Sequence, residues 1–180
     1  MADKYQAVFG AIFMPTSVIN LVAGFVIRPY ITKLSDQWER NALPEFAGTV
    51  GRLAAIIAAL TALAVGGAWI LGIPVLSMLY PKIAYMLREC RLALAFIILG
   101  GAFNAYVNLF YYALIIMQEQ KRIFLGYVGV TVAALLISSP CVRAAGLLGG
   151  SLSYLLLMAA LTACFGLTSL VMYRRRVRGI

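Results

Sequence analysis

The feature that most constrains this chain is a series of long apolar stretches without a single charged residue. Five occur, at 5–27, 53–81, 92–118, 123–142 and 144–173. A helix needs about 20 apolar residues to cross the hydrocarbon core of a bilayer, which is roughly 30 Å thick. Each stretch is long enough, so the sequence predicts an all-α membrane protein with about five transmembrane helices.

The composition leaves no room for a soluble domain beside these spans. Of 180 residues, 63% are hydrophobic and 12% charged, whereas soluble domains carry about 25% charged residues. We therefore expect one transmembrane helical domain over 1–180. Only Arg143 separates the last two spans, and Pro140 and Gly146 beside it predict a tight turn.

The longest polar segment, 28–52, joins the first two spans. Its apolar residues Leu34, Trp38, Leu43 and Phe46 stand among charges, a pattern typical of an amphipathic helix at the membrane interface. We expect Pro44 to break that helix. A catalytic loop is the alternative, but the segment holds no histidine, no cysteine and no serine-based triad.

The basic residues predict the orientation of the spans. Positively charged loops stay in the cytoplasm. Ten Lys and Arg fall on one side, against five on the other: the larger group comprises Arg28, Lys33, Arg40, Arg52, Lys121, Arg122 and four arginines of the tail, and the smaller one Lys4, Lys82, Arg88, Arg91 and Arg143. The N-terminus is therefore expected outside and the basic C-terminus in the cytoplasm.

The charged and metal-binding residues exclude several kinds of chemistry. The chain has no histidine, and its three cysteines show no paired spacing, so we expect no metal and no cofactor. Its basic residues lie between spans, as membrane anchors do, so we expect no nucleic-acid partner. No acidic residue lies in the middle of a span. Because ion-coupled transporters use carboxylates there, the sequence shows no obvious ion-coupling site.

The third span carries the clearest polar pattern. Asn104, Asn108 and Tyr111 recur at i, i+4 and i+7 and therefore share one helix face. They are candidates for a cavity wall that offers amides and a phenol to sugar hydroxyls. Hydrogen bonding between packed helices is the alternative, and the sequence alone favours it over the cavity wall. Asn20 in the first span poses the same choice.

Two further sets of residues mark span ends. Arg28, Arg52 and Arg91 lie at predicted boundaries, where a guanidinium either binds a phosphate or extends to lipid headgroups. Gly146 and Gly150 form a GxxxG pattern, which favours close helix packing.

The order of several short segments resembles that of a known family. These are FVIRPYITKL at 25–34, GIPVLSMLY at 72–80, MQEQKR at 117–122 and AGLLGGS at 145–151. Together they are similar to the C-terminal part of bacterial polysaccharide and lipopolysaccharide flippases, in the multidrug/oligosaccharidyl-lipid/polysaccharide exporter superfamily.

This resemblance implies part of the second lobe of a two-lobe exporter in the plasma or inner membrane. Such flippases move lipid-linked oligosaccharides outward through a cavity between lobes, and their basic cavity residues suggest Arg28, Arg52 and Arg91 as counterparts. The chain would match the last five helices, from the eighth onward. The N-terminal lobe is missing, so its expected partners are that lobe or a second copy, the lipid-linked oligosaccharide and membrane lipids.

We therefore expect a transporter-type protein, not an enzyme, that serves polysaccharide and lipopolysaccharide biosynthesis. One alternative is a small membrane scaffold that packs through Gly146 and Gly150 and transports nothing. Another is a membrane enzyme of lipid or polysaccharide synthesis, which would need clustered acids, histidines or a nucleophile that the sequence does not show.

Overall fold

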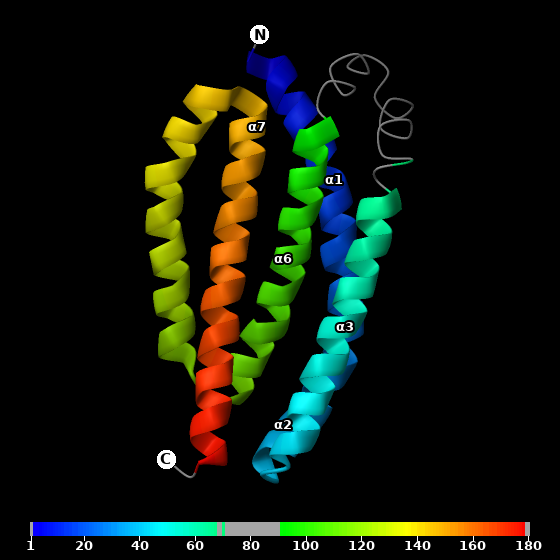
Figure 1. Cartoon of the computed structure of the whole chain (residues 1–180), viewed down its shortest axis with the longest axis vertical. Helices are drawn as coiled ribbons and strands as arrows, with labels where there is room; N and C mark the ends of the chain where they lie inside the picture. The colour runs from blue at the N-terminus through cyan, green and yellow to red at the C-terminus, as the bar shows by residue number, and fades with distance from the viewer. Residues whose placement is uncertain (1, 68–69, 71–90, 179–180) are drawn as a thin grey trace.

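The computed structural model describes residues 2–67, 70 and 91–178, and every element within them is a helix (Figure 1). The elements are α1 (Ala2–Ile27), the 3₁₀ turn η1 (Arg28–Tyr30), α2 (Ile31–Glu39), α3 (Leu43–Gly67), α6 (Arg91–Ile116) and α7 (Gln120–Val177). The later part of the predicted span 53–81 lies outside the described residues, as does Cys90.

Among the residues that the structure describes, five helical segments are long and apolar enough to cross a membrane. They are Thr16–Glu39, Leu43–Gly67, Leu92–Ile116, Gln120–Arg143 and Ala145–Val177. Large apolar side chains such as Phe25, Leu63 and Leu135 stand on the outside of the bundle. In water such a surface would be costly, whereas lipid solvates it. The prediction of an all-α membrane protein is confirmed.

Pro29 explains where α1 ends. Proline has no backbone N–H, so an α-helix loses a hydrogen bond at that position. Here the chain tightens into η1 over Arg28–Tyr30 and re-enters α-helix at Ile31, and Tyr30 keeps helical backbone angles (φ −90°, ψ −8°). The first half of the predicted connector therefore continues α1 into the amphipathic α2, which buries Leu34, Gln37 and Trp38.

The turn between α2 and α3 ends the connector earlier than the sequence predicts. Asn41 adopts a left-handed conformation (φ 58°), and the Ala42 N–H donates to the Gln37 carbonyl at 2.9 Å. Helix α3 then begins at Leu43, with Pro44 in its first turn, where a missing N–H costs nothing. The sequence predicts the break at Pro44, but the structure places it at 40–42, where Asn41 turns the chain, and Pro44 belongs to α3. The stretch 43–52 already belongs to the next long helix, so Arg52 lies within α3.

Helix α6 is the central element of the bundle. More than half of its apolar stretch, 56%, is buried inside the protein, whereas the buried share is 17% or less in each of the other four segments. One face, with Ala105, Leu109 and Ala113, packs against α1, α2 and α3. Another, with Val107 and Leu114, packs against Ile123, Leu161 and Phe165 of α7.

Helix α7 is a hairpin of two arms, as the sequence predicts. The first arm is Gln120–Arg143 and the second Ala145–Val177, and the chain reverses between them (Figure 1). The reversal occurs at Ala145 (φ −131°, ψ 15°) and Gly146 (φ 53°, ψ −126°). These Gly146 angles resemble the first central position of a type II′ turn, which glycine dominates.

The structure corrects the role expected of Gly146. Gly146 serves the chain reversal, as its φ of 53° shows, and among the described residues a Cβ there would meet nothing within 4 Å. The close approach is at Gly149, where a Cβ would collide with the backbone carbonyl of Cys141 on the other arm. Gly150 is partly buried on the second arm.

Candidate functional site

The polar face of α6 lies between the two packed sides of that helix. Asn104, Asn108 and Tyr111 are all partly buried. The Tyr111 ring lies 5.5 Å from that of Tyr112 and 6.4 Å from that of Tyr127 on the first arm of α7, and it packs against the α6–α7 core. Tyr111 therefore has a structural contact with α7.

The two asparagines differ from Tyr111 in this respect. Within the part of the chain that the structure describes, the side chains of Asn104 and Asn108 form no hydrogen bond with other residues. Other polar side chains nearby do bond across helices: the Tyr106 hydroxyl donates to the Ala54 carbonyl at 3.0 Å, and the Thr162 hydroxyl to the Phe103 carbonyl at 2.9 Å. Packing between the described helices thus does not account for the two amides.

Asn20 lies on the face of α1 that meets α6. One turn earlier, the Thr16 hydroxyl donates to the Ile97 carbonyl at 3.3 Å, and a Cβ on Gly101 would meet Thr16 Cγ2 at 2.5 Å. Because Asn20 follows Thr16 by four residues, it shares this face. Its Nδ2 donates to the Thr16 carbonyl at 3.0 Å, while its buried Oδ1 has no partner among the described residues.

We call Asn104, Asn108 and Tyr111 the polar strip. Tyr111 at one edge contacts the first arm of α7, and on the other side α1 packs on α6 through the face that carries Asn20. Asn104 lies near the middle of α6, about 20 Å from either end at 1.5 Å per residue. The strip therefore offers unpaired amides close to the centre of a membrane-spanning helix.

The three predicted arginines do not come together. Arg28 opens η1 and Arg52 lies in the first half of α3, both toward the end of the bundle that carries α2, and both are exposed. Arg91 is the first residue of α6, whose start lies at the opposite end (Figure 1). The side chain of Arg91 lies outside the described residues. One cationic site built from all three is therefore excluded by the backbone positions.

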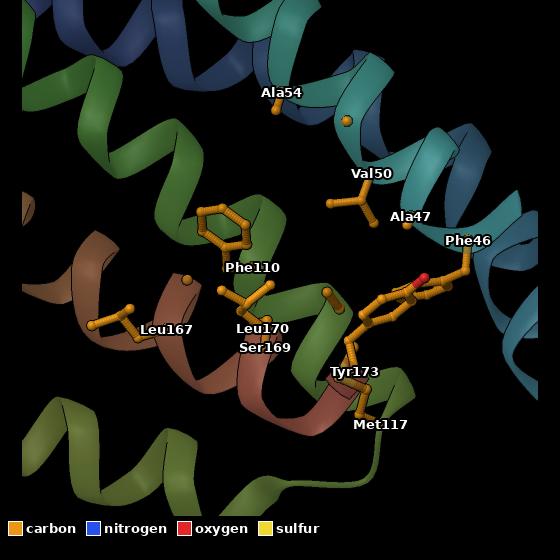
Figure 2. Close-up of a pocket in the computed structure, with 13 residues that line it drawn as sticks. Phe46, Ala47, Val50, Ala54, Phe110, Met117, Leu167, Ser169, Leu170 and Tyr173 are labelled. Atoms are coloured by element: carbon orange, nitrogen blue, oxygen red, sulfur yellow. The ribbon is translucent and has the colours of Figure 1, made fainter. Parts of the chain in front are cut away.

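A lateral apolar groove, which sequence reasoning missed, lies between α3, α6 and the second arm of α7 (Figure 2). Its volume is about 450 Å³. Val50 of α3, Phe110 of α6 and Leu170 of α7 line it, and the buried Ser169 hydroxyl beside them has no partner among the described residues. An α-helix turns about 100° per residue, so Phe110 and Ala113 point about 120° and 180° away from Asn104 around the axis of α6. The groove is therefore separate from the polar strip.

Side chains from the end of α7 close one end of this groove. Tyr173 reaches toward Phe46 of α3 (Figure 2) and packs on the same apolar core. One turn on, the Arg176 guanidinium stacks on the Trp38 ring, 4.5 Å from its centroid. Its Nη2 donates to the Trp38 carbonyl at 3.3 Å, and its Nε to Asn41 Oδ1 at 3.4 Å. These contacts tie the C-terminal end of α7 to the α2–α3 turn.

The fold and this site define a multi-pass α-helical membrane protein with a polar strip in its central helix. No protein-family model, no curated protein and no solved structure matches the chain. Any more particular function therefore rests on the strip, the groove and the charges described above.

Proposed function

We propose that the chain forms part of a flippase that moves lipid-linked oligosaccharides across the plasma or inner membrane for cell-surface polysaccharide and lipopolysaccharide biosynthesis. The observation that carries this proposal is the polar strip. Asn104 and Asn108 present amides near the middle of a span, and no described residue of the chain uses them. A carrier of a polar headgroup needs such groups at that depth.

The energetic argument concerns the sugar and its pyrophosphate. Moving an amide or hydroxyl into hydrocarbon without a hydrogen bond costs roughly 4–8 kcal/mol, and an oligosaccharide carries many hydroxyls. A wall of amides and phenols replaces the lost water contacts. Flipping needs no covalent step, so the protein only has to line the path, and we propose that it is not an enzyme.

The strip supplies one wall of that path and needs a second. A polar face turned to lipid would carry the same cost for its own amides. In two-lobe exporters the site lies at the interface of the lobes. We propose that the uncovered side of the strip faces an N-terminal lobe supplied by another chain, or a second copy of this one.

The proposed direction of transport follows from the basic residues. Their distribution favours an external N-terminus and a cytoplasmic C-terminus. An anionic headgroup that moves outward is then favoured by an inside-negative potential, by roughly 2.3 kcal/mol per charge per 100 mV.

The scaffold alternative has lost its main support. It rested on a packing surface formed by Gly146 and Gly150, but Gly146 serves the hairpin turn. The close contact, at Gly149, is made within the chain.

Substitution of the strip tests the proposal in a flippase-deficient strain that also expresses an N-terminal lobe. Asn108→Leu should abolish or strongly reduce surface polysaccharide while the protein still inserts, because apolar residues favour insertion. Thr131→Leu is the matched control, since Thr131 is an exposed polar residue of the first α7 arm, and it should leave export intact. Unchanged export with Asn104→Leu, Asn108→Leu and Tyr111→Phe would refute the role of the strip.

A further inference from the structure

A second hollow, of about 290 Å³, lies between α2 and the first turns of α3. Lys33 and Gln37 of α2 line one wall. Glu45, Gly48, Thr49 and Arg52 of α3 line the other. A Cβ on Gly48 would meet nothing within 4 Å, so the glycine keeps that wall open. This hollow is distinct from the polar strip and from the apolar groove.

The charges around this hollow are not neutralised by one another. Among the described residues, the ion pairs join Arg40 to Asp36 at 2.8 Å and Arg122 to Glu119 at 3.1 Å. Neither pair includes Lys33, Arg52 or Glu45, although all three line one hollow. Two cations and one carboxylate are therefore available to a ligand.

Gln37 adds a buried polar group to the wall. It is only 6% exposed, and its Oε1 has no hydrogen-bond partner within the described residues. A buried amide oxygen without a partner is rare in folded proteins, since it loses its water without replacement. A rotation of the Gln37 amide toward the hollow would let a ligand satisfy it.

The mixture of charges restricts the class of ligand. Lys33, Arg52 and the Thr49 hydroxyl suit a phosphate, but a simple anion would be repelled by Glu45. An ammonium suits Glu45 and the Gln37 oxygen, but a simple cation would be repelled by Lys33 and Arg52. A phosphate that carries its own ammonium matches both halves of the site.

The surface beyond the hollow indicates that this ligand is a lipid. Arg52, Ala55, Ala59 and Leu63 follow one another at i, i+3, i+7 and i+11, and so lie on one face of α3. Ala55, Ala59 and Leu63 are all exposed, Leu63 by 74%. Acyl chains attached to a headgroup in the hollow would therefore continue along an apolar stripe. We propose that this site binds a phospholipid with an ethanolamine headgroup.

Lipid binding to the purified full-length chain tests this site by native mass spectrometry. The probes are phosphatidylethanolamine, phosphatidylcholine and phosphatidylglycerol with identical acyl chains. Wild type should bind the ethanolamine lipid about five- to tenfold more tightly than the others, the order expected for one charge-assisted hydrogen bond at a partly exposed site. Choline has no N–H to donate, and glycerol carries no cation. Equal affinity for the three lipids would overturn the proposal.

Variants then separate the two halves of the headgroup. Glu45→Gln should abolish the preference for ethanolamine, whereas Lys33→Gln and Arg52→Gln should weaken binding of both the ethanolamine and the glycerol lipid by about three- to tenfold. Lys121→Gln and Glu39→Gln are matched controls, since both residues are exposed and lie outside the hollow, and should change nothing. A preference that survives Glu45→Gln would refute the site.

A final arm distinguishes a lipid from a soluble ligand. Free phosphoethanolamine carries the same charges without acyl chains. At a concentration equal to that of the lipid, free phosphoethanolamine should not displace the bound phosphatidylethanolamine, because it makes no contact with the apolar stripe on α3. Full competition at equal concentration would show that the hollow serves a soluble phosphate and would refute the lipid proposal.

Discussion

Gly149→Ala should destabilise the α7 hairpin, and Gly129→Ala should not. The new Cβ at position 149 would overlap the carbonyl oxygen of Cys141 and lie 3.3 Å from Ala145 Cβ. A backbone carbonyl cannot rotate away as a side chain can, so the two arms must separate. At Gly129 a Cβ would meet nothing within 4 Å. The same substitution thus meets opposite surroundings on the two arms of one hairpin.

The expected magnitudes follow from two opposing terms. Alanine favours helix over glycine by about 1 kcal/mol, and this gain applies to both positions. Overpacking costs about 1–3 kcal/mol, and a clash with backbone belongs at the upper end. Gly149→Ala should therefore lose about 2 kcal/mol net, while Gly129→Ala gains up to about 1 kcal/mol.

Unfolding of the detergent-solubilised protein by increasing SDS, followed by tryptophan fluorescence, measures both variants. Trp38 is a suitable reporter because it packs on Phe46 and Arg176 at the far end of the second arm. Equal unfolding midpoints for Gly149→Ala and Gly129→Ala would refute the close packing of the two arms.

Three further predictions concern the turn, the C-terminal contacts and the orientation. Gly146→Ala should cost about 1–3 kcal/mol of unfolding free energy, because φ is 53° there; an unfolding midpoint matching that of Gly129→Ala would contradict the turn geometry. Arg176→Gln should lose about 0.5–1 kcal/mol for the stacking on Trp38 and shift the Trp38 fluorescence, whereas the exposed Arg174→Gln should not; identical spectra would exclude that contact. In single-cysteine variants, an impermeant thiol reagent should label Cys90 in intact cells and leave the mid-span Cys164 unlabelled; labelling of Cys90 only after membrane disruption would reverse the orientation.

The last three spans could be predicted closely from the sequence, whereas α3 begins at Leu43, ten residues before the predicted 53–81. Helix α6 covers Arg91–Ile116 against a predicted 92–118, and the α7 arms cover Gln120–Arg143 and Ala145–Val177 against 123–142 and 144–173. Charges end these runs because a span cannot easily carry them through hydrocarbon. Helix α3 shows the limit of this rule. Arg52 lies inside it, since a long guanidinium side chain can extend to the headgroups while its backbone stays helical.

The candidate site was only partly visible in the sequence. Helical periodicity placed Asn104, Asn108 and Tyr111 on one face, but it could not show that Tyr111 packs on Tyr127 while the amides have no partner among the described residues. The spacing of Gly146 and Gly150 is the same in a packed helix and in a turn, and only the φ of Gly146 distinguishes them. The apolar groove depends on how α3, α6 and α7 sit together, which no local pattern encodes.

The most direct test of the proposed function is whether this chain flips substrate only with a second wall. Surface polysaccharide would be measured in a flippase-deficient strain that expresses the chain alone, an N-terminal lobe alone, or both. Membrane levels of each chain would be matched, and the oligomeric state of the chain determined in the same membranes. We expect export when the chain and the N-terminal lobe are expressed together. The chain expressed alone should support export only if it forms a dimer. Export supported by a demonstrably monomeric 180-residue chain would contradict the two-lobe account.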